Sequence, residues 1–135
     1  MGGSLLILLD THVLIWLALD PGRISSKAIA TIDEARQTGS GLAVCDITML
    51  EVAQLTHRGR ITFPVGLATF LSEVEQRFTV FPITAQISTQ AFTLPASYPN
   101  DPADRAIGAT AVVEGLTLVT ADDQIRKSRA VPTVW

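Results

Sequence analysis

The chain has 135 residues, 47% of them hydrophobic, and 13 acidic against 10 basic residues give a formal net charge of −3. This length suits one domain with a substantial core, and the acidic balance excludes a basic field that would attract nucleic acid over the whole surface. The single cysteine excludes an internal disulfide and any zinc site with two thiolates. With no apolar run near the roughly 20 residues of a membrane span and no signal-peptide pattern, we expect a cytoplasmic protein.

Residues 5–10 read LLILLD and predict a strand that is buried on both faces and ends at a carboxylate. An unbroken apolar run is typical of a central parallel strand covered by helices on both sides. In open α/β sheets, ligands bind at the carboxyl ends of the strands, which is where Asp10 would lie. A short helix is predicted over residues 11–18, ended by the breaker Asp20-Pro21-Gly22.

The next stretch predicts two helices around a second strand. Ser25 is a good N-cap for the first of them, and the apolar residues 42–45 form the strand. Thr48 and Glu51 fit a capping box, in which a hydroxyl and a Glu three residues later satisfy each other's backbone donors. That pattern predicts a helix from about Thr48 to Gly59, and it offers a purely structural role for Glu51.

The rest of the chain continues the alternation of helices and strands. We predict helices opened by Pro64, over 84–92, from Asp101 to Gly115 and just after Asp122, and strands at 78–81, 116–119 and 131–135. This order predicts a single α/β domain with a largely parallel central sheet flanked by helices.

Four carboxylates occupy comparable places in this pattern. Asp10 and Asp122 directly follow strands, whereas Glu51 and Asp104 fall in the first turns of helices. Helix capping alone would explain each of them. At one sheet edge, however, four carboxylates would repel and raise each other's pKa. Such a cluster is best explained as a ligand set for a hard divalent cation such as Mg²⁺ or Mn²⁺.

The segments LLDTHVLIW, TMLEVA, DPADRAIGATA and LVTAD resemble the four acidic motifs of PIN-domain ribonucleases, most closely those of VapC-type toxins of type II toxin–antitoxin pairs. The resemblance covers nearly the whole chain and implies one PIN-like domain over residues 1–135. It implies that Asp10, Glu51, Asp104 and Asp122 are the catalytic acids, with the three aspartates as metal ligands. The implied activity is Mg²⁺- or Mn²⁺-dependent hydrolysis of RNA phosphodiester bonds.

The resemblance also suggests supporting residues. Thr11 and Thr120 match the hydroxyl residues of the family site, and Asp101 is a common companion acid. Arg105 adjoins Asp104, so it is the favoured guide for RNA phosphates, although it would equally pair with a neighbouring carboxylate. Weaker candidates for RNA binding, each as readily explained as a solvated helix end, are Arg58, Arg60, Arg126, Lys127 and Arg129.

The partner that the resemblance implies is a small VapB-type antitoxin. Such an antitoxin lays a helix in an apolar groove of the toxin and can place a basic side chain among the acids. We expect the groove between the third and fourth predicted helices and the first one, with Trp16, Leu55 and Phe70 as anchors. A homodimer is the family expectation.

Two other functions remain open at this point. A receiver-type phosphoacceptor domain also has an acidic pocket at strand ends, but it needs an acidic pair after the first strand and a suitably placed lysine. Only Asp10 follows the first strand here, and Lys127 falls on a predicted helix. A catalytically inert PIN scaffold that only binds partners is the second alternative.

Overall fold

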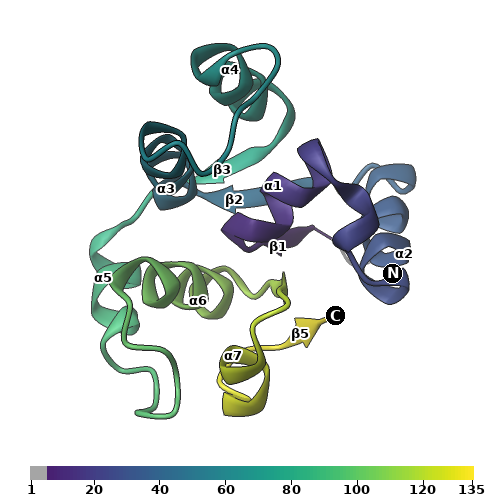
Figure 1. Ribbon diagram of the computed structural model, residues 1–135. Helices are drawn as coiled ribbons and strands as arrows, with labels where there is room; N and C mark the ends of the chain where they lie inside the picture. The colour runs from purple at the N-terminus through teal and green to yellow at the C-terminus, as the bar shows by residue number, and fades with distance from the viewer. Residues whose placement is uncertain (1–5) are drawn as a thin grey trace.

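A five-stranded sheet forms the centre of the protein in the computed structural model, which describes residues 6–135 (Figure 1). The strands lie in the order β3-β2-β1-β4-β5, and all neighbouring pairs are parallel. They comprise β1 (Ile7–Leu9), β2 (Leu42–Cys45), β3 (Thr79–Phe81), β4 (Thr117–Val119) and β5 (Thr133–Val134). The predicted parallel sheet is confirmed, with β1 at its centre; Leu5 of the predicted first strand lies outside the described residues.

Helices connect successive strands, as parallel pairing requires. They are α1 (Thr11–Leu19), the 3-10 helix η1 (Pro21–Arg23), α2 (Ser26–Gln37), α3 (Asp46–His57), α4 (Leu67–Arg77), α5 (Ala85–Ala91), α6 (Pro102–Glu114) and α7 (Asp123–Ser128). Within residues 6–135, no helix combines the length and the apolar character that crossing a membrane would need.

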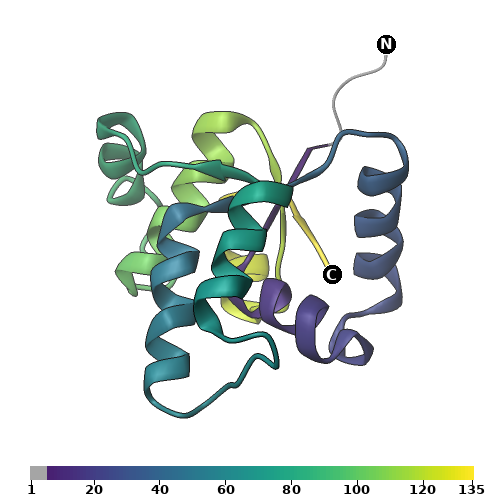
Figure 2. The same cartoon turned by 90° about the horizontal axis from the view of Figure 1, so that it is seen from above.

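Both faces of the sheet are covered, so β1 has no solvent-exposed side. Leu9 is fully buried among residues of α1, α2 and α4, and its neighbour Leu8 is fully buried against α6 and α7. Successive strand residues point to opposite faces, which explains why an unbroken apolar run is needed here. Figure 1 shows α3 and α4 above β1 and β2, with α6 and α7 below them. In Figure 2, α2 and α5 lie on opposite sides of the strands.

The start of α3 differs from the prediction. The helix begins at Asp46, directly after β2, and its N-cap residue Cys45 makes no side-chain capping hydrogen bond. Thr48 therefore lies inside the helix, fully buried, and its hydroxyl contacts the hydroxyl of Thr11. The capping-box interpretation of Glu51 is wrong, because the strand passes into the helix without a loop.

The start of α4 is also later than predicted. Pro64 does not open the helix, which begins at Leu67 after Gly66 with φ of 85°. A positive φ is incompatible with a right-handed helix, so Gly66 separates the Pro64 turn from α4. The turn is held by Phe63, whose ring stacks on Phe70 with a centroid separation of 3.9 Å.

The start and end of α6 follow the prediction. The side chain of Asp101 accepts a hydrogen bond from the backbone N–H of Asp104, and Pro102 is the first helical residue. Gly115 ends the helix in the left-handed conformation, with φ of 68°. Asp104 is thereby fixed in the first turn, on the side of the sheet where β1, β2 and β4 end.

Candidate active site

The four acids of the predicted site reach the carboxyl ends of the strands from four elements. Asp10 follows β1 and caps α1, and Asp122 follows β4 and caps α7. Glu51 comes from α3, which continues directly from β2, and Asp104 comes from the first turn of α6. Because β1 pairs with β2 on one side and β4 on the other, the acids surround the point where the strand order reverses. That switch point is where open α/β sheets bind their ligands.

Thr120 joins the two aspartates that follow the central strands. Its hydroxyl donates to Oδ2 of Asp10 over 2.6 Å, and it accepts a hydrogen bond from the backbone N–H of Asp122 over 3.1 Å. The other oxygen of Asp10 accepts the backbone N–H of Thr11. Asp10 is only 8% exposed, so these bonds fix a buried carboxylate.

Two further threonines hold Glu51. The Thr11 hydroxyl donates to Oε1 of Glu51, and it lies 3.0 Å from the hydroxyl of Thr48. Thr11 and Thr48 are both buried, whereas Glu51 is half-buried. Glu51 therefore points toward the start of α1, beside Asp10, and does not cap its own helix.

The charges of the four acids act on one another at this edge of the sheet. Burial raises the pKa of Asp104 to about 7, and the charges of Asp10, Asp101, Glu51 and Asp122 add to the increase. Burial also raises the pKa of Asp10 and that of Glu51, against the opposing hydrogen bonds from Thr120 and Thr11 respectively. A cation bound in this crevice would lower the raised pKa values of these carboxyls and favour their ionised forms.

The same acids supply only oxygen ligands, which suits a hard cation. In their present positions, no three His, Cys, Asp or Glu side chains within residues 6–135 lie close enough together to hold a metal ion. The kind of ligand therefore fits Mg²⁺ or Mn²⁺, and full coordination needs the carboxylates to turn toward one another.

Arg105 does not take the position expected of a guide for RNA. Its side chain is buried, and its guanidinium donates hydrogen bonds to backbone carbonyls at the end of α5 and in the following loop. These carbonyls belong to Ala91, Leu94, Pro95 and Tyr98. The prediction for Arg105 was wrong because successive residues on an α-helix point about 100° apart, so a basic residue next to an acid in the sequence does not face the same site.

The other basic candidates lie on the surface. Arg58 and Arg60 follow the last residue of α3, at the end of the helix away from its start beside Cys45. Arg126 pairs with Asp123 over 3.1 Å, and Lys127 and Arg129 are exposed at the end of α7, the helix that Asp122 caps. Binding of RNA by any of them stays a prediction.

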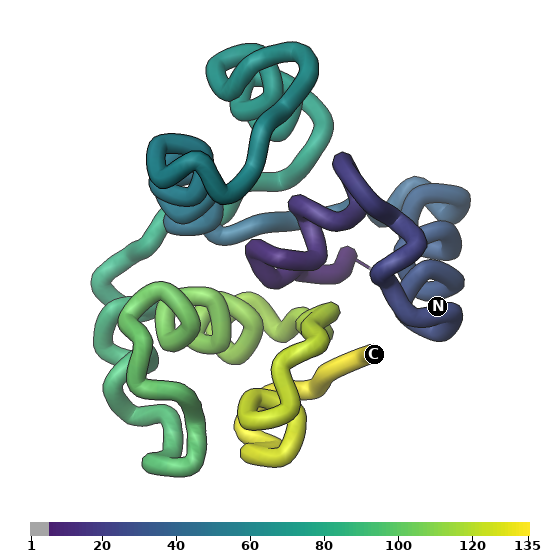
Figure 3. Tube along the Cα trace, viewed as in Figure 1, coloured from purple at the N-terminus to yellow at the C-terminus, as the bar shows by residue number. Residues whose placement is uncertain are grey.

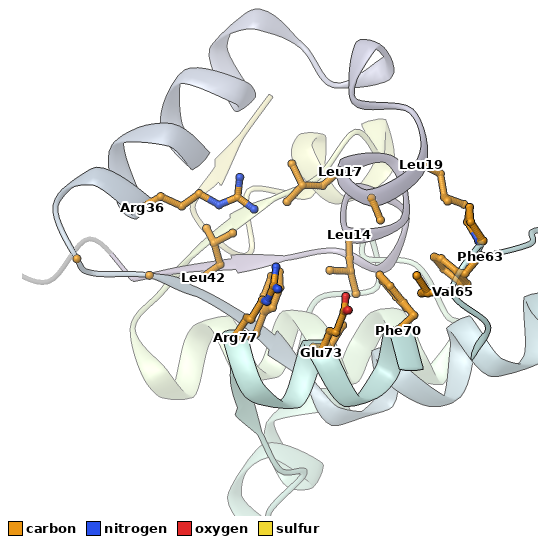
Figure 4. A pocket seen from close by; sticks show the side chains of 16 residues that line it. Leu14, Leu17, Leu19, Arg36, Leu42, Phe63, Val65, Phe70, Glu73 and Arg77 are labelled. Carbon is orange, nitrogen blue, oxygen red and sulfur yellow. The ribbon is translucent and has the colours of Figure 1, made fainter. Parts of the chain in front are cut away.

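An apolar groove of about 890 Å³ lies between α1, α4 and the turn that precedes α4. Figure 4 shows Leu14, Leu17 and Phe70 along it, with Arg36 on one side and Arg77 on the other. Its place beside α1 and α4 and the position of Phe70 agree with the prediction, but the predicted contribution of the third helix is wrong, because no residue of α3 lines the groove; Arg36 at the end of α2 and Leu42 of β2 line it instead.

The other two predicted anchors do not line this groove. Trp16 and Leu55 pack against the core. The ring centroid of Trp16 lies 4.7 Å from the guanidinium carbon of Arg23 and 5.9 Å from the ring centroid of Trp135. The prediction placed Trp16 and Leu55 in the groove because amphipathic spacing identifies a buried face without telling which neighbour covers it.

Sequence reasoning missed two residues beside the acids. The sequence predicts Thr48 only as a helix cap, and it gives no sign that Tyr98 is fully buried with its hydroxyl donating to the carbonyl of Asp104. Only the spacing of Thr48 and Glu51, one turn apart, carried a signal.

Comparison with known proteins agrees with this geometry. The family model of the PIN domain matches residues 7–130. Ribonuclease VapC22 of Mycobacterium tuberculosis is 37% identical over 131 residues, which cover 96% of this chain and 98% of the relative.

Solved structures share the fold at lower identity. VapBC of Salmonella typhimurium bound to DNA has a TM-score of 0.72 at 18% identity, covering 96% of this chain and 97% of that one. VapBC-5 of Mycobacterium tuberculosis has a TM-score of 0.65 at 17% identity, covering 96% and 98%. From the matched family and the 37% identical relative, the chain belongs to the PIN-domain family and to its VapC-type members.

Proposed function

We propose that this protein is a metal-dependent endoribonuclease that acts as the toxin of a toxin–antitoxin pair. The observation that carries the proposal is the convergence of Asp10, Glu51, Asp104 and Asp122, with the pKa of Asp104 raised to about 7 by burial and by the other acids. The name of the 37% identical relative, a ribonuclease, supports RNA as the substrate.

In this proposal Asp10, Asp104 and Asp122 hold Mg²⁺ or Mn²⁺. The bound cation supplies a Lewis acid for the phosphate and lowers the pKa of a coordinated water. Thr120 holds Asp10 and Asp122 next to each other through its two hydrogen bonds. Thr11 orients Glu51 toward the same crevice.

The remaining contributions come from the surface and from the α6 cap. Asp101 fixes the first turn of α6, and with it Asp104, by accepting the N–H of that residue. The exposed cations after α3 and on α7 offer phosphate contacts on an otherwise acidic protein. An RNA substrate would place the activity in the cytoplasm.

RNA cleavage by the purified chain tests the proposal. We expect cleavage with Mn²⁺ or Mg²⁺ and none after EDTA is added. Asp122→Asn keeps a residue able to cap α7 but removes a ligand charge, so it should lower the rate by orders of magnitude. Asp123→Asn, at the exposed neighbouring position, is the matched control and should cut like the original chain.

Two outcomes would contradict the proposal. Cleavage that persists in EDTA, or equally in Asp122→Asn, would place the activity elsewhere. Binding of Mn²⁺ without any cleavage would favour the catalytically inert PIN scaffold.

The groove supports a VapB-type antitoxin as the partner. Solved neighbours of this fold are complexes of the VapBC type. Apolar side chains such as Leu17 and Phe70 line the groove, and charged side chains lie at its edges. This pattern would fit an amphipathic helix with its apolar face in the groove. We also expect a homodimer, which light scattering of the purified chain would test.

A further inference from the structure

We propose that Thr48 is a positioning residue for Glu51 and acts through the hydroxyl of Thr11. The inference rests on the proposed ribonuclease function, because it concerns an acid of that site. It assigns a role in the site to a residue whose spacing suggested only a helix cap.

The three side chains form a continuous chain of hydrogen bonds between α1 and α3. Thr48 Oγ1 lies 3.0 Å from Thr11 Oγ1, and Thr11 Oγ1 donates to Glu51 Oε1. Thr48 is 0% exposed and Thr11 is 2% exposed, so solvent does not compete for either hydroxyl.

The direction of these bonds follows from counting protons. A threonine hydroxyl has one proton to donate and can accept from others. The proton of Thr11 goes to the Glu51 carboxylate, so the bond between the two hydroxyls must be donated by Thr48. The donated bond from Thr48 holds the Thr11 hydroxyl in the rotamer that points at Glu51.

This arrangement connects the elements that carry two of the acids. Thr11 is the first residue of α1 and follows Asp10, while Thr48 and Glu51 lie one turn apart on α3. Loss of the Thr48 hydroxyl would leave Thr11 free to turn, and Glu51 would lose its fixed orientation beside Asp10. Residues that orient the ligands of a metal site from behind typically change metal affinity or activity by about 10- to 100-fold when they are mutated, and Thr48 has a comparable place behind the acid Glu51, acting through Thr11.

Thr110 offers a matched control within the same chain. It is also a helical threonine with 0% exposure, but its hydroxyl donates to the carbonyl of Ala106 within α6. Thr48→Val and Thr110→Val thus each remove one buried hydroxyl with little change of shape. Thr48→Ser restores the hydroxyl and removes a methyl group instead.

The first measurement needs neither metal nor RNA. The side-chain carboxyl carbon of Glu51 is followed by NMR at one pH in the four proteins. We expect its resonance to move in Thr48→Val and to stay near its original position in Thr48→Ser and Thr110→Val. An unmoved resonance in Thr48→Val would overturn the inference, whether or not the chain cuts RNA.

The second measurement relates the orientation to the site. Mn²⁺ affinity by electron paramagnetic resonance and the RNA cleavage rate should each fall by about tenfold or more in Thr48→Val, with Thr48→Ser and Thr110→Val within about threefold of the original. Equal losses in the two valine variants would make Thr48 a packing residue only. If the unaltered chain neither binds Mn²⁺ nor cleaves RNA, the ribonuclease proposal is contradicted. The NMR result alone then decides whether Thr48 positions Glu51.

Discussion

Asp104 has a pKa of about 7, because burial and the neighbouring acids disfavour its charged form. A protonated carboxyl is a poor cation ligand, so metal binding must displace this proton. We expect Mn²⁺ affinity to rise steeply as the pH increases from about 6 to 8. Titration calorimetry across that range would check this, and an affinity independent of pH would argue against Asp104 as a ligand.

The same carboxyl should also affect stability without metal. Its pKa is higher in the folded chain, about 7, than the 3.8 of the free group, so the folded state binds more protons between these values. Stability therefore falls as pH rises through this window. Asp104→Asn removes the contribution, and we expect its melting temperature, measured by calorimetry, to fall less with pH than that of the original chain.

Arg105 should matter for folding more than any exposed cation. Arg105→Met would leave carbonyls of Ala91, Leu94, Pro95 and Tyr98 without their shared donor, at a cost of roughly 3 kcal/mol or more. Arg126→Met breaks only a surface pair with Asp123 and should change stability by no more than about 0.5 kcal/mol. Urea denaturation of both variants measures the difference, and equal losses would contradict it.

At the scale of single residues, the sequence allowed the four acids to be predicted but not how each is held. Acids that follow apolar strands are visible as a pattern. The hydrogen bond between the hydroxyls of Thr11 and Thr48 joins residues far apart in the chain, and the direction of the Arg105 side chain depends on where the α5–α6 loop runs. Neither is encoded in local spacing.

At position 108 of α6, a close contact with Tyr98 leaves room only for glycine. A Cβ added at Gly108 would lie 2.3 Å from the hydroxyl of Tyr98 and 2.6 Å from its ring carbon Cζ. The Tyr98 hydroxyl in turn donates to the carbonyl of Asp104, so ring and helix fix each other at the first turn of α6.

Gly108→Ala should therefore destabilise the protein. At an open helical position the exchange would stabilise by about 1 kcal/mol, but here we expect a loss of about 2 kcal/mol from overpacking against Tyr98. Guanidinium denaturation would check the sign. In a double-mutant cycle, Gly108→Ala should cost less when Tyr98→Ala has removed the ring, and strict additivity would show that the contact is not responsible.

Element types were predicted better than element starts. The predicted ends of α6 are confirmed, because Asp101, Pro102 and Gly115 start and end the helix through its own backbone. The start of α4 was wrong because the positive φ of Gly66 serves a turn that is held by the stacking of Phe63 on Phe70. Contacts between segments decide such boundaries, and a local pattern does not contain them.

At the scale of the whole molecule, a substitution in the groove between α1 and α4 tests whether the antitoxin binds there. Val65 lines it and is 55% exposed, so Val65→Asp should spare the fold but place a charge where an apolar helix would bind. We expect antitoxin affinity, measured by calorimetry, to fall by about tenfold or more. Phe92→Asp alters an apolar side chain that is 73% exposed and does not line the groove, and this variant should bind the antitoxin normally. Normal binding by Val65→Asp would place the partner elsewhere.

The overall topology followed from the alternation of strands and helices, and parallel pairing was confirmed. The position of β4 beside β1 was not predicted. Each strand is a short apolar run, so the sequence does not tell which strands are neighbours in the sheet. That position is nevertheless what brings Thr120 and Asp122 next to Asp10.

The pairing of β1 with β4 has a consequence for synthesis. Figure 3 shows the yellow end of the chain returning beside its purple beginning, and β4 and Asp122 belong to that last part. A growing polypeptide presents Asp10 first, and Thr120, whose hydroxyl binds Asp10, follows 110 residues later, just before the Asp122 carboxylate. If the protein is the nuclease proposed here, a copy whose synthesis has not passed Asp122 lacks one of the proposed metal ligands and should not cut the message that encodes it. The order of the strands would thereby delay that activity until β4 and Asp122 have been made.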